Sequence, residues 1–225
     1  KTTLTAAFAA LNKNAIVADC DVDAADLHIL LKPEIKQSFS YAGGKKAVID
    51  PVSCTACSVC EMYCRFDAIH DFQVDPLACE GCGFCYHICP VNAIIMKEVI
   101  SGYYHVSEFA EGDFVDAALE PGEGNSGKLV SEVKNRAKNI AEQNENNWLI
   151  IDGPPGIGCP VNASLTGADF ALLITEPTVS GLHDLERVIQ LIERFRIPAA
   201  IVINKYDINP KITNKIGDYA LEKDL

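Results

Sequence analysis

Two runs of cysteines, Cys54-Thr-Ala-Cys57-Ser-Val-Cys60-Glu-Met-Tyr-Cys64 and Cys79-Glu-Gly-Cys82-Gly-Phe-Cys85-Tyr-His-Ile-Cys89-Pro90, decide how this 225-residue chain is interpreted. They hold eight of its ten cysteines, and each has the spacing CxxCxxCxxxC. A shift of 25 residues superimposes the first run on the second, together with Ile49-Asp50-Pro51 on Val74-Asp75-Pro76 and Ala68-Ile69 on Ala93-Ile94. The chain therefore contains two copies of one unit. Each copy is predicted to form a short strand, a turn, a one-turn helix and a second short strand.

The spacing of the cysteines favours iron–sulfur chemistry. Three thiolates with two residues between them can surround one face of a [4Fe–4S] cube, and where two such runs occur the fourth cysteine of each ligates the other cluster. We therefore predict two [4Fe–4S] clusters. The predicted ligands are Cys54, Cys57, Cys60 and Cys89 for the first cluster, and Cys79, Cys82, Cys85 and Cys64 for the second.

Disulfides and zinc are the alternative uses of so many cysteines. A disulfide framework is typical of small secreted domains, and nothing in this sequence resembles a signal peptide. Zinc sites typically use two CxxC pairs with a longer spacer, often with histidine, and do not need the additional cysteines of these runs. Both alternatives are therefore weaker than the cluster interpretation.

The composition of the chain argues against two classes of function, nucleic-acid binding and membrane insertion. The net charge of −12 argues against nucleic-acid binding, which needs a basic surface. No apolar run reaches the length of a transmembrane helix, so no membrane contact is expected from these residues. Cysteines that hold clusters indicate a reducing cytoplasm.

Because the chain opens at Lys1 without a methionine and Leu225 lies in a predicted helix, we expect a fragment of a longer protein.

Outside the cysteine runs, three short motifs indicate a phosphate site. Lys1-Thr2-Thr3 precedes an alanine-rich helix, as the end of a P-loop would. The apolar strand 15–18 leads into Asp19-Cys20-Asp21, and the strand 148–151 ends in Asp152-Gly153. An acid that closes an apolar strand suits a Walker B role beside Mg²⁺, and the glycines after it have N–H groups that can sense a γ-phosphate. Taken singly, each acid would be read as a turn or cap residue.

Together these motifs resemble the MinD/ParA class of deviant-Walker P-loop ATPases, and the whole chain resembles members of that superfamily with an inserted ferredoxin domain. The resemblance implies that ATP and Mg²⁺ are bound, with Lys1 and Thr3 at the phosphates and Thr2 on the metal. It makes Asp21 the acid that positions the attacking water and Asp152 the acid that holds the metal's water shell. It also implies a homodimer. The second lysine that defines the deviant loop is not present, so this fragment is expected to be impaired in hydrolysis.

The strand 199–203 ends in Asn204-Lys205-Tyr206-Asp207, an NKxD sequence that resembles the guanine-reading motif of GTPases. In MinD-like ATPases the same strand end supplies an asparagine to adenine, so the closer family resemblance assigns Asn204 to ATP.

The cysteine-rich block resembles bacterial-type ferredoxins with two [4Fe–4S] clusters. It departs from them at Arg65, which follows Cys64 where Pro90 follows Cys89. Proline has no N–H to offer a sulfur and stiffens the turn. The surroundings of the second cluster, and hence its potential, are expected to differ from those of the first.

Alternating strands and helices predict an α/β fold, a doubly wound and mostly parallel P-loop sheet with an inserted small α+β ferredoxin-type domain. The predicted domains are residues 1–46 and 99–225 for the ATPase and 47–98 for the insert. The predicted function is nucleotide-driven switching coupled to electron transfer to an unidentified redox partner. The alternatives are a cluster carrier or scaffold ATPase, and a MinD-like positioning ATPase with redox-sensing clusters.

Four further features carry weaker expectations. The glycine-rich turn 121–128 resembles a phosphate loop but lacks its spacing, although Lys128 would lie near the nucleotide in a dimer. Cys159 is expected to be a buried small residue and not a cluster bridge, and Cys20 is expected to be a core residue. His105 has no evident partner in the sequence.

Overall fold

A computed structural model describes residues 1–124 and 126–225. Contacts divide the chain into two compact units. Residues 1–37, 105–117 and 126–225 form the first unit, and residues 38–104 with 118–124 form the second. The second unit is thus somewhat wider than the predicted insert 47–98, whose boundaries remain a prediction.

The first unit has the alternating elements that the sequence predicts. Its helices are α1 (Thr2–Leu11), α2 (Leu27–Leu31), α5 (Ser126–Gln143), α6 (Cys159–Leu165), α7 (Val179–Phe195) and α8 (Pro210–Glu222). Its strands include β1 (Ala15–Asp19), β9 (Trp148–Asp152), β10 (Ala171–Thr175) and β11 (Ala199–Ile203). Helix α5 begins three residues earlier and ends three residues earlier than the predicted helix 129–146.

A largely parallel arrangement of strands confirms the predicted α/β class. Strand β1 pairs in parallel with β9 on one side and with β8 (Gly112–Leu119) on the other. With β2 (Glu34–Tyr41) and β7 (Gly102–Phe109) these strands form one sheet in the order β2-β7-β8-β1-β9. A separate parallel pair is made by β10 and β11. All five residues of β1 are buried, as expected for a strand inside a parallel sheet.

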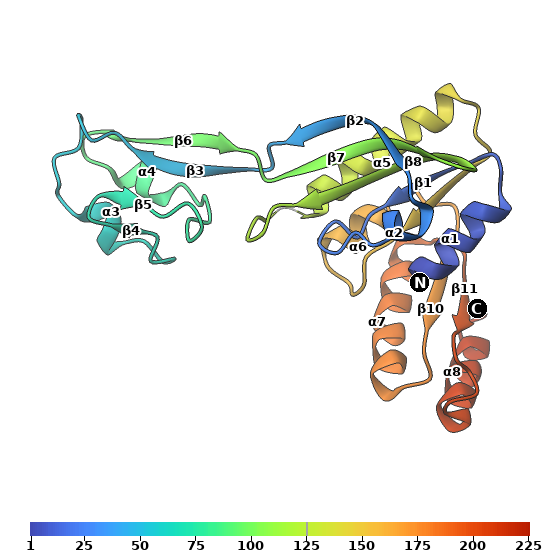
Figure 1. The fold of residues 1–225 in the computed structure, drawn as a ribbon. Coiled ribbons are helices and arrows are strands. Elements are labelled where there is room, and N and C mark those ends of the chain that lie inside the picture. Colours follow the sequence, from blue (N-terminus) through green and yellow to red (C-terminus); the bar gives the residue numbers. More distant parts are fainter. Residues whose placement is uncertain (125) are drawn as a thin grey trace. The chain divides into compact units, whose positions relative to one another are not determined.

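Two apolar clusters hold this unit together. In the first cluster, Ala9 of α1 and Leu27 of α2 pack against Val17 and Phe114 of the sheet. In the second cluster, Leu185 and Ile189 of α7 pack with Ile216 of α8 against β10 and β11. Figure 1 shows α7 and α8 beside these two strands. The carboxyl ends of β1 and β9, which carry the acids predicted from the sequence, are therefore rigidly placed.

The second unit is built from the repeat. Its elements are β3 (Gly44–Ile49), α3 (Val59–Met62), β4 (Ile69–His70), β5 (Gln73–Val74), α4 (Phe84–Ile88) and β6 (Ile94–Val99). Each half crosses to the other, because β3 pairs antiparallel with β6 and β4 pairs antiparallel with β5 (Figure 1). The first strand of one half thus lies beside the second strand of the other.

Hydrogen bonds repeat across the two halves at the same spacing of 25 residues. The Asp50 N–H donates to the Ala93 carbonyl at 2.8 Å, and the Asp75 N–H donates to the Ala68 carbonyl, also at 2.8 Å. Each aspartate carboxylate then accepts the N–H two residues on, from Val52 at 3.1 Å and from Leu77 at 2.8 Å. These Asx turns fix the entry to each cysteine run in the same way.

The turns within the runs need a left-handed backbone at matching positions. The φ angles are 54° at Ala56 and 65° at its counterpart Gly81, and 61° at Ser58 and 74° at its counterpart Gly83. Left-handed backbone costs a residue with a Cβ about 1 kcal/mol relative to glycine. Only the second copy therefore uses the residue type that this turn favours.

Alanine at Gly81 is expected to destabilise the unit far more than alanine at Gly83, although both backbones are left-handed. A Cβ on Gly81 would overlap the Lys45 carbonyl oxygen, whereas a Cβ on Gly83 meets nothing within 4 Å. We expect a loss of about 1 kcal/mol for Gly83→Ala, from backbone conformation alone, and at least twice that for Gly81→Ala. Urea unfolding under anaerobic conditions measures both, and equal losses would contradict this account.

Candidate functional site

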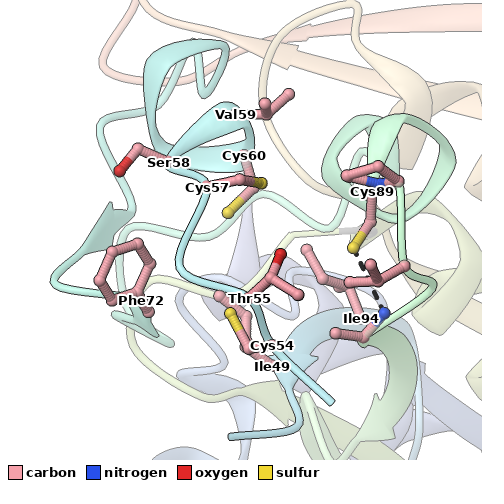
Figure 2. Close-up of a pocket in the computed structure, with 13 residues that line it drawn as sticks. Ile49, Cys54, Thr55, Cys57, Ser58, Val59, Cys60, Phe72, Cys89 and Ile94 are labelled. Carbon is pink, nitrogen blue, oxygen red and sulfur yellow. Dashed lines mark hydrogen bonds between the residues drawn. The ribbon is translucent and has the colours of Figure 1, made fainter.

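The first hollow of the second unit is lined by the four cysteines predicted for one cluster. Cys54, Cys57 and Cys60 come from the first run and Cys89 comes from the end of the second. Figure 2 shows these side chains around one space, with Phe72 and Ile94 at its border. The crossing of the two halves brings the fourth cysteine to the opposite run.

The second hollow is lined by the other predicted set, Cys64, Cys79, Cys82 and Cys85. Cys60 of the first set also lines it, so the two hollows adjoin within the unit. The structure therefore places the first predicted set around one hollow and the second predicted set, together with Cys60, around the other, while cross-ligation of clusters remains a prediction.

The fourth cysteines are held by matching contacts. The Ala68 N–H donates to Cys64 Sγ at 3.4 Å, and the Ala93 N–H donates to Cys89 Sγ at 3.3 Å. Figure 2 shows the second of these bonds as a dashed line at Cys89. An N–H directed at a sulfur stabilises a thiolate and is one means by which a protein tunes the potential of an iron–sulfur cluster.

The eight thiols surround cavities, and they do not converge on single points. Among the described residues, no three His, Cys, Asp or Glu side chains are close enough to hold one metal ion. No cysteine of the described part forms a disulfide. Burial, with smaller contributions from neighbouring thiolates, raises the pKa of the Cys60 and Cys85 thiols. The donor set thus suits an iron–sulfur cube, which spans such a space and keeps its ligands deprotonated.

A second candidate site surrounds the ammonium group of Lys1, directly before α1. Lys1 Nζ lies 3.3 Å from Asp21 Oδ2 and 3.5 Å from Asp152 Oδ1, and it also donates to the Gly153 carbonyl oxygen. These contacts join three stretches that are far apart in the sequence. Lys1, Asp21, Asp152 and Gly153, each predicted for the nucleotide site, are therefore neighbours in the structure.

Asp152 is fitted to bind a cation or its water shell. Its side chain is 1% exposed, and Oδ1 accepts a hydrogen bond from Thr5 Oγ1 at 3.3 Å. Its other oxygen, Oδ2, is buried and has no hydrogen-bond partner among the described residues. A buried carboxylate oxygen without a partner is costly, and Mg²⁺ with its waters would satisfy it. Sequence analysis missed Thr5, which lies one helical turn after Lys1.

Asp19 is a second residue that sequence analysis did not assign to the site. It is 1% exposed at the end of β1. Its Oδ1 accepts the Asp21 N–H at 3.1 Å and its Oδ2 accepts the Leu27 N–H at 3.2 Å. Burial raises the pKa of Asp19 from 3.8 to about 6. Asp19 thus ties the loop that carries Asp21 to the end of the strand.

The remaining predicted nucleotide residues lie at element ends. Thr2 begins α1 and is partly exposed, and Thr3 follows it with its side chain exposed. Asn204 follows β11, and its Nδ2 donates to Glu176 Oε1 at 3.3 Å, while Lys205 Nζ lies 2.7 Å from the same oxygen. The side-chain hydrogen bond joins Asn204 to Glu176 and not to Lys1, and its role with adenine remains a prediction.

The weaker expectations have mixed outcomes. Cys20 is buried, as predicted. His105 Nδ1 lies 3.5 Å from Asp116 Oδ2 on the neighbouring strand, within ion-pair distance, although this buried nitrogen makes no hydrogen bond among the described residues. Cys159 is exposed and begins α6, which argues against the expected buried position. Lys128 lies in the first turn of α5, and Asn125 of the glycine-rich turn lies outside the described residues.

The fold and these two sites resemble those of MinD/ParA-type ATPases, with a 4Fe–4S ferredoxin domain in addition. Residues 72–95 match the family of 4Fe–4S binding domains. The chain is 35% identical over 196 residues to the uncharacterized protein MJ0578 of Methanocaldococcus jannaschii, covering 87% of this chain and 69% of that protein, and it belongs to the same family.

Two further similarities concern MinD itself. A stretch of 76 residues, 33% of this chain and 28% of the relative, is 32% identical to the septum site-determining protein MinD of Bacillus subtilis. Among solved structures, the cell division ATPase MinD of Pyrococcus furiosus matches with a TM-score of 0.49 and 15% identity, over 96% of this chain and 73% of that one. No helix among the described residues is long and apolar enough to cross a membrane.

Proposed function

We propose that this protein binds and hydrolyses ATP with Mg²⁺ and uses the resulting switch to control electron transfer through two [4Fe–4S] clusters. The observation that carries the proposal is the position of Lys1 between Asp21, two residues after β1, and Asp152, the last residue of β9. Between these two acids the chain passes through both cysteine runs. We propose that a movement of the two acids with the state of the nucleotide is transmitted along the chain segments that lead to the cluster unit.

In this proposal each group has a separate task. Lys1 holds the phosphates, Thr2 and Asp152 hold Mg²⁺ with its waters, and Asp21 orients the attacking water. Bound clusters supply one-electron chemistry. The eight cysteines hold them, and the N–H groups of Ala68 and Ala93 fix the sulfurs of Cys64 and Cys89. We further propose that the protein is a homodimer, as the resemblance to MinD-like ATPases implies. We place it in the cytoplasm, because thiolate ligands persist in a reducing compartment.

Asp21→Ala and Asp152→Ala test the coupling. Each is expected to abolish the ATP-dependent part of acceptor reduction while the iron content and the visible absorbance of the clusters stay unchanged. The reason is that both acids touch Lys1 and neither belongs to the unit that contains the cysteines. Anaerobic reduction of a dye, with and without ATP, gives the measurement.

Ser180→Ala is a suitable control, because Ser180 lies on α7 and its hydroxyl bonds to Asp184 on the same helix. It should leave ATP-dependent reduction unaltered. ATP-dependent reduction that survives both aspartate substitutions would refute the coupling. Rapid transfer of intact clusters to an apoprotein would favour the carrier function instead.

A further inference from the structure

The two hollows of the cluster unit differ in the residues that line them, although the repeat gives most of these residues a counterpart in the other half. Phe66 and Phe84 line the hollow of Cys64 and Cys79, and their counterparts at a shift of 25 residues are valines, Val91 and Val59, in the other hollow. At these two positions the second hollow has aromatic side chains and the first has aliphatic ones, although Phe72 also lines the first hollow.

The aromatic side chains of the second hollow face solvent. Tyr63, Phe66 and Phe84 line the hollow and are 58%, 43% and 50% exposed. The rings of Tyr63 and Phe84 lie 6.3 Å apart with a tilt of 58°. We call these three residues the aromatic rim. Clustered exposed aromatic side chains mark protein interaction surfaces, where they supply much of the binding energy.

The two hollows also differ in the charge of the side chains that line them. Arg65 and Glu80 line the hollow with the aromatic rim, and their counterparts Pro90 and Thr55 line the other. Among the described residues that line either hollow, Arg65 is the only Lys, Arg or His. A cation beside a cluster favours its reduced, more negative form, and Glu80 opposes that effect.

The unit that contains the two hollows is acidic, which favours a partner with a positive surface. Residues 38–104 and 118–124 contain nine Asp or Glu and four Lys or Arg, a net charge of −5. A partner that approaches this unit gains from a positive surface, which raises the rate of association.

We propose that the aromatic rim is the port for electron exchange, and that it docks an electron-carrier protein with an apolar contact face and a basic border. This inference rests on the electron-transfer role proposed above. With both clusters bound, the cluster held by Cys64, Cys79, Cys82 and Cys85 would give one electron to the carrier, so that this cluster is oxidised and the carrier is reduced. The cluster of the adjoining hollow, which shares Cys60, would replace that electron and be oxidised in turn.

The port is tested by giving its rim the residues of the other half. The variant Tyr63→Ile, Phe66→Val, Phe84→Val replaces each aromatic residue by its counterpart. Anaerobically reduced protein is mixed in a stopped-flow instrument with an oxidised basic c-type cytochrome, or with ferricyanide, which needs no docking. We expect the rate constant for the cytochrome to fall at least about tenfold, and the rate constant for ferricyanide to change less than about twofold. Added salt should slow only the cytochrome reaction.

Phe170→Val, which removes an exposed aromatic side chain from the other unit, is the control, and it should not change the cytochrome rate. Arg65→Pro adds a readout independent of rates: in a redox titration followed by electron paramagnetic resonance, one cluster's midpoint should fall and the other's should stay. An unchanged cytochrome rate in the triple variant, or equal shifts of both midpoints, would overturn the port. Absence of iron from the wild-type protein would instead remove the proposed function, so the two failures are distinguishable.

Discussion

Alanine at both Cys57 and Cys89 is expected to leave about four irons per chain, half of the roughly eight that two cubes contain. Both cysteines line the same hollow, although they come from different runs. Two ligands lost from one cluster prevent it from forming, while the other keeps all four of its ligands. Iron and acid-labile sulfide on anaerobically purified protein provide the measurement.

The companion variant with alanine at Cys82 and Cys89 separates cross-ligation from ligation within a run. These two cysteines line different hollows, so each cluster loses one ligand and neither remains intact. If each run held its own cluster, the outcomes would be exchanged, and Cys82 with Cys89 would be the pair that spares four irons. Cys20→Ala, at a buried cysteine in the other unit, should retain the full complement.

The arrangement of the cysteines was accessible from the sequence because the repeat and the spacing constrain it strongly. Two copies of CxxCxxCxxxC, with matching residues on both sides, predict paired halves, and the pairing of β3 with β6 and β4 with β5 follows that pattern. The left-handed backbone at Ala56 and Ser58 was not predictable in the same way. Only comparison with Gly81 and Gly83 indicates it, since alanine and serine carry no such signal by themselves.

At the candidate nucleotide site, the meeting of the acids was predictable from the sequence, but the residues that support them were not. Strand-ending acids point to one edge of a parallel sheet, and Asp21 and Asp152 indeed meet at Lys1. Thr5 and the partner of His105 depend on which side chains face one another across elements, which spacing alone does not specify. The role of Asp19 could have been found from the sequence, because it is the one acid in an otherwise apolar strand. A buried acid in such a strand needs hydrogen-bond partners to offset the cost of its burial.

Asp19 is expected to make the stability of the first unit depend on pH in a direction opposite to that of most carboxylates. Burial is the largest effect on it and raises its pKa from 3.8 to about 6, although the N–H groups of Asp21 and Leu27 act against the rise. The folded protein therefore binds this proton more tightly than the unfolded chain does. The resulting stabilisation is complete below a pH of about 3.8 and is lost as the pH rises through about 6. The difference corresponds to about 3 kcal/mol of unfolding free energy.

Asp19→Asn removes this titration, so the variant should show a flatter dependence of unfolding free energy on pH between about 4 and 7. Pulse proteolysis at several pH values measures that slope, and the carbon-13 shift of the Asp19 carboxyl group reports its midpoint directly. A midpoint near 4, or equal slopes in both proteins, would contradict the assignment. Because the Asp21 N–H binds the same carboxylate, a midpoint near 6 would mean that the loop carrying Asp21 is held by a group that titrates close to neutral pH.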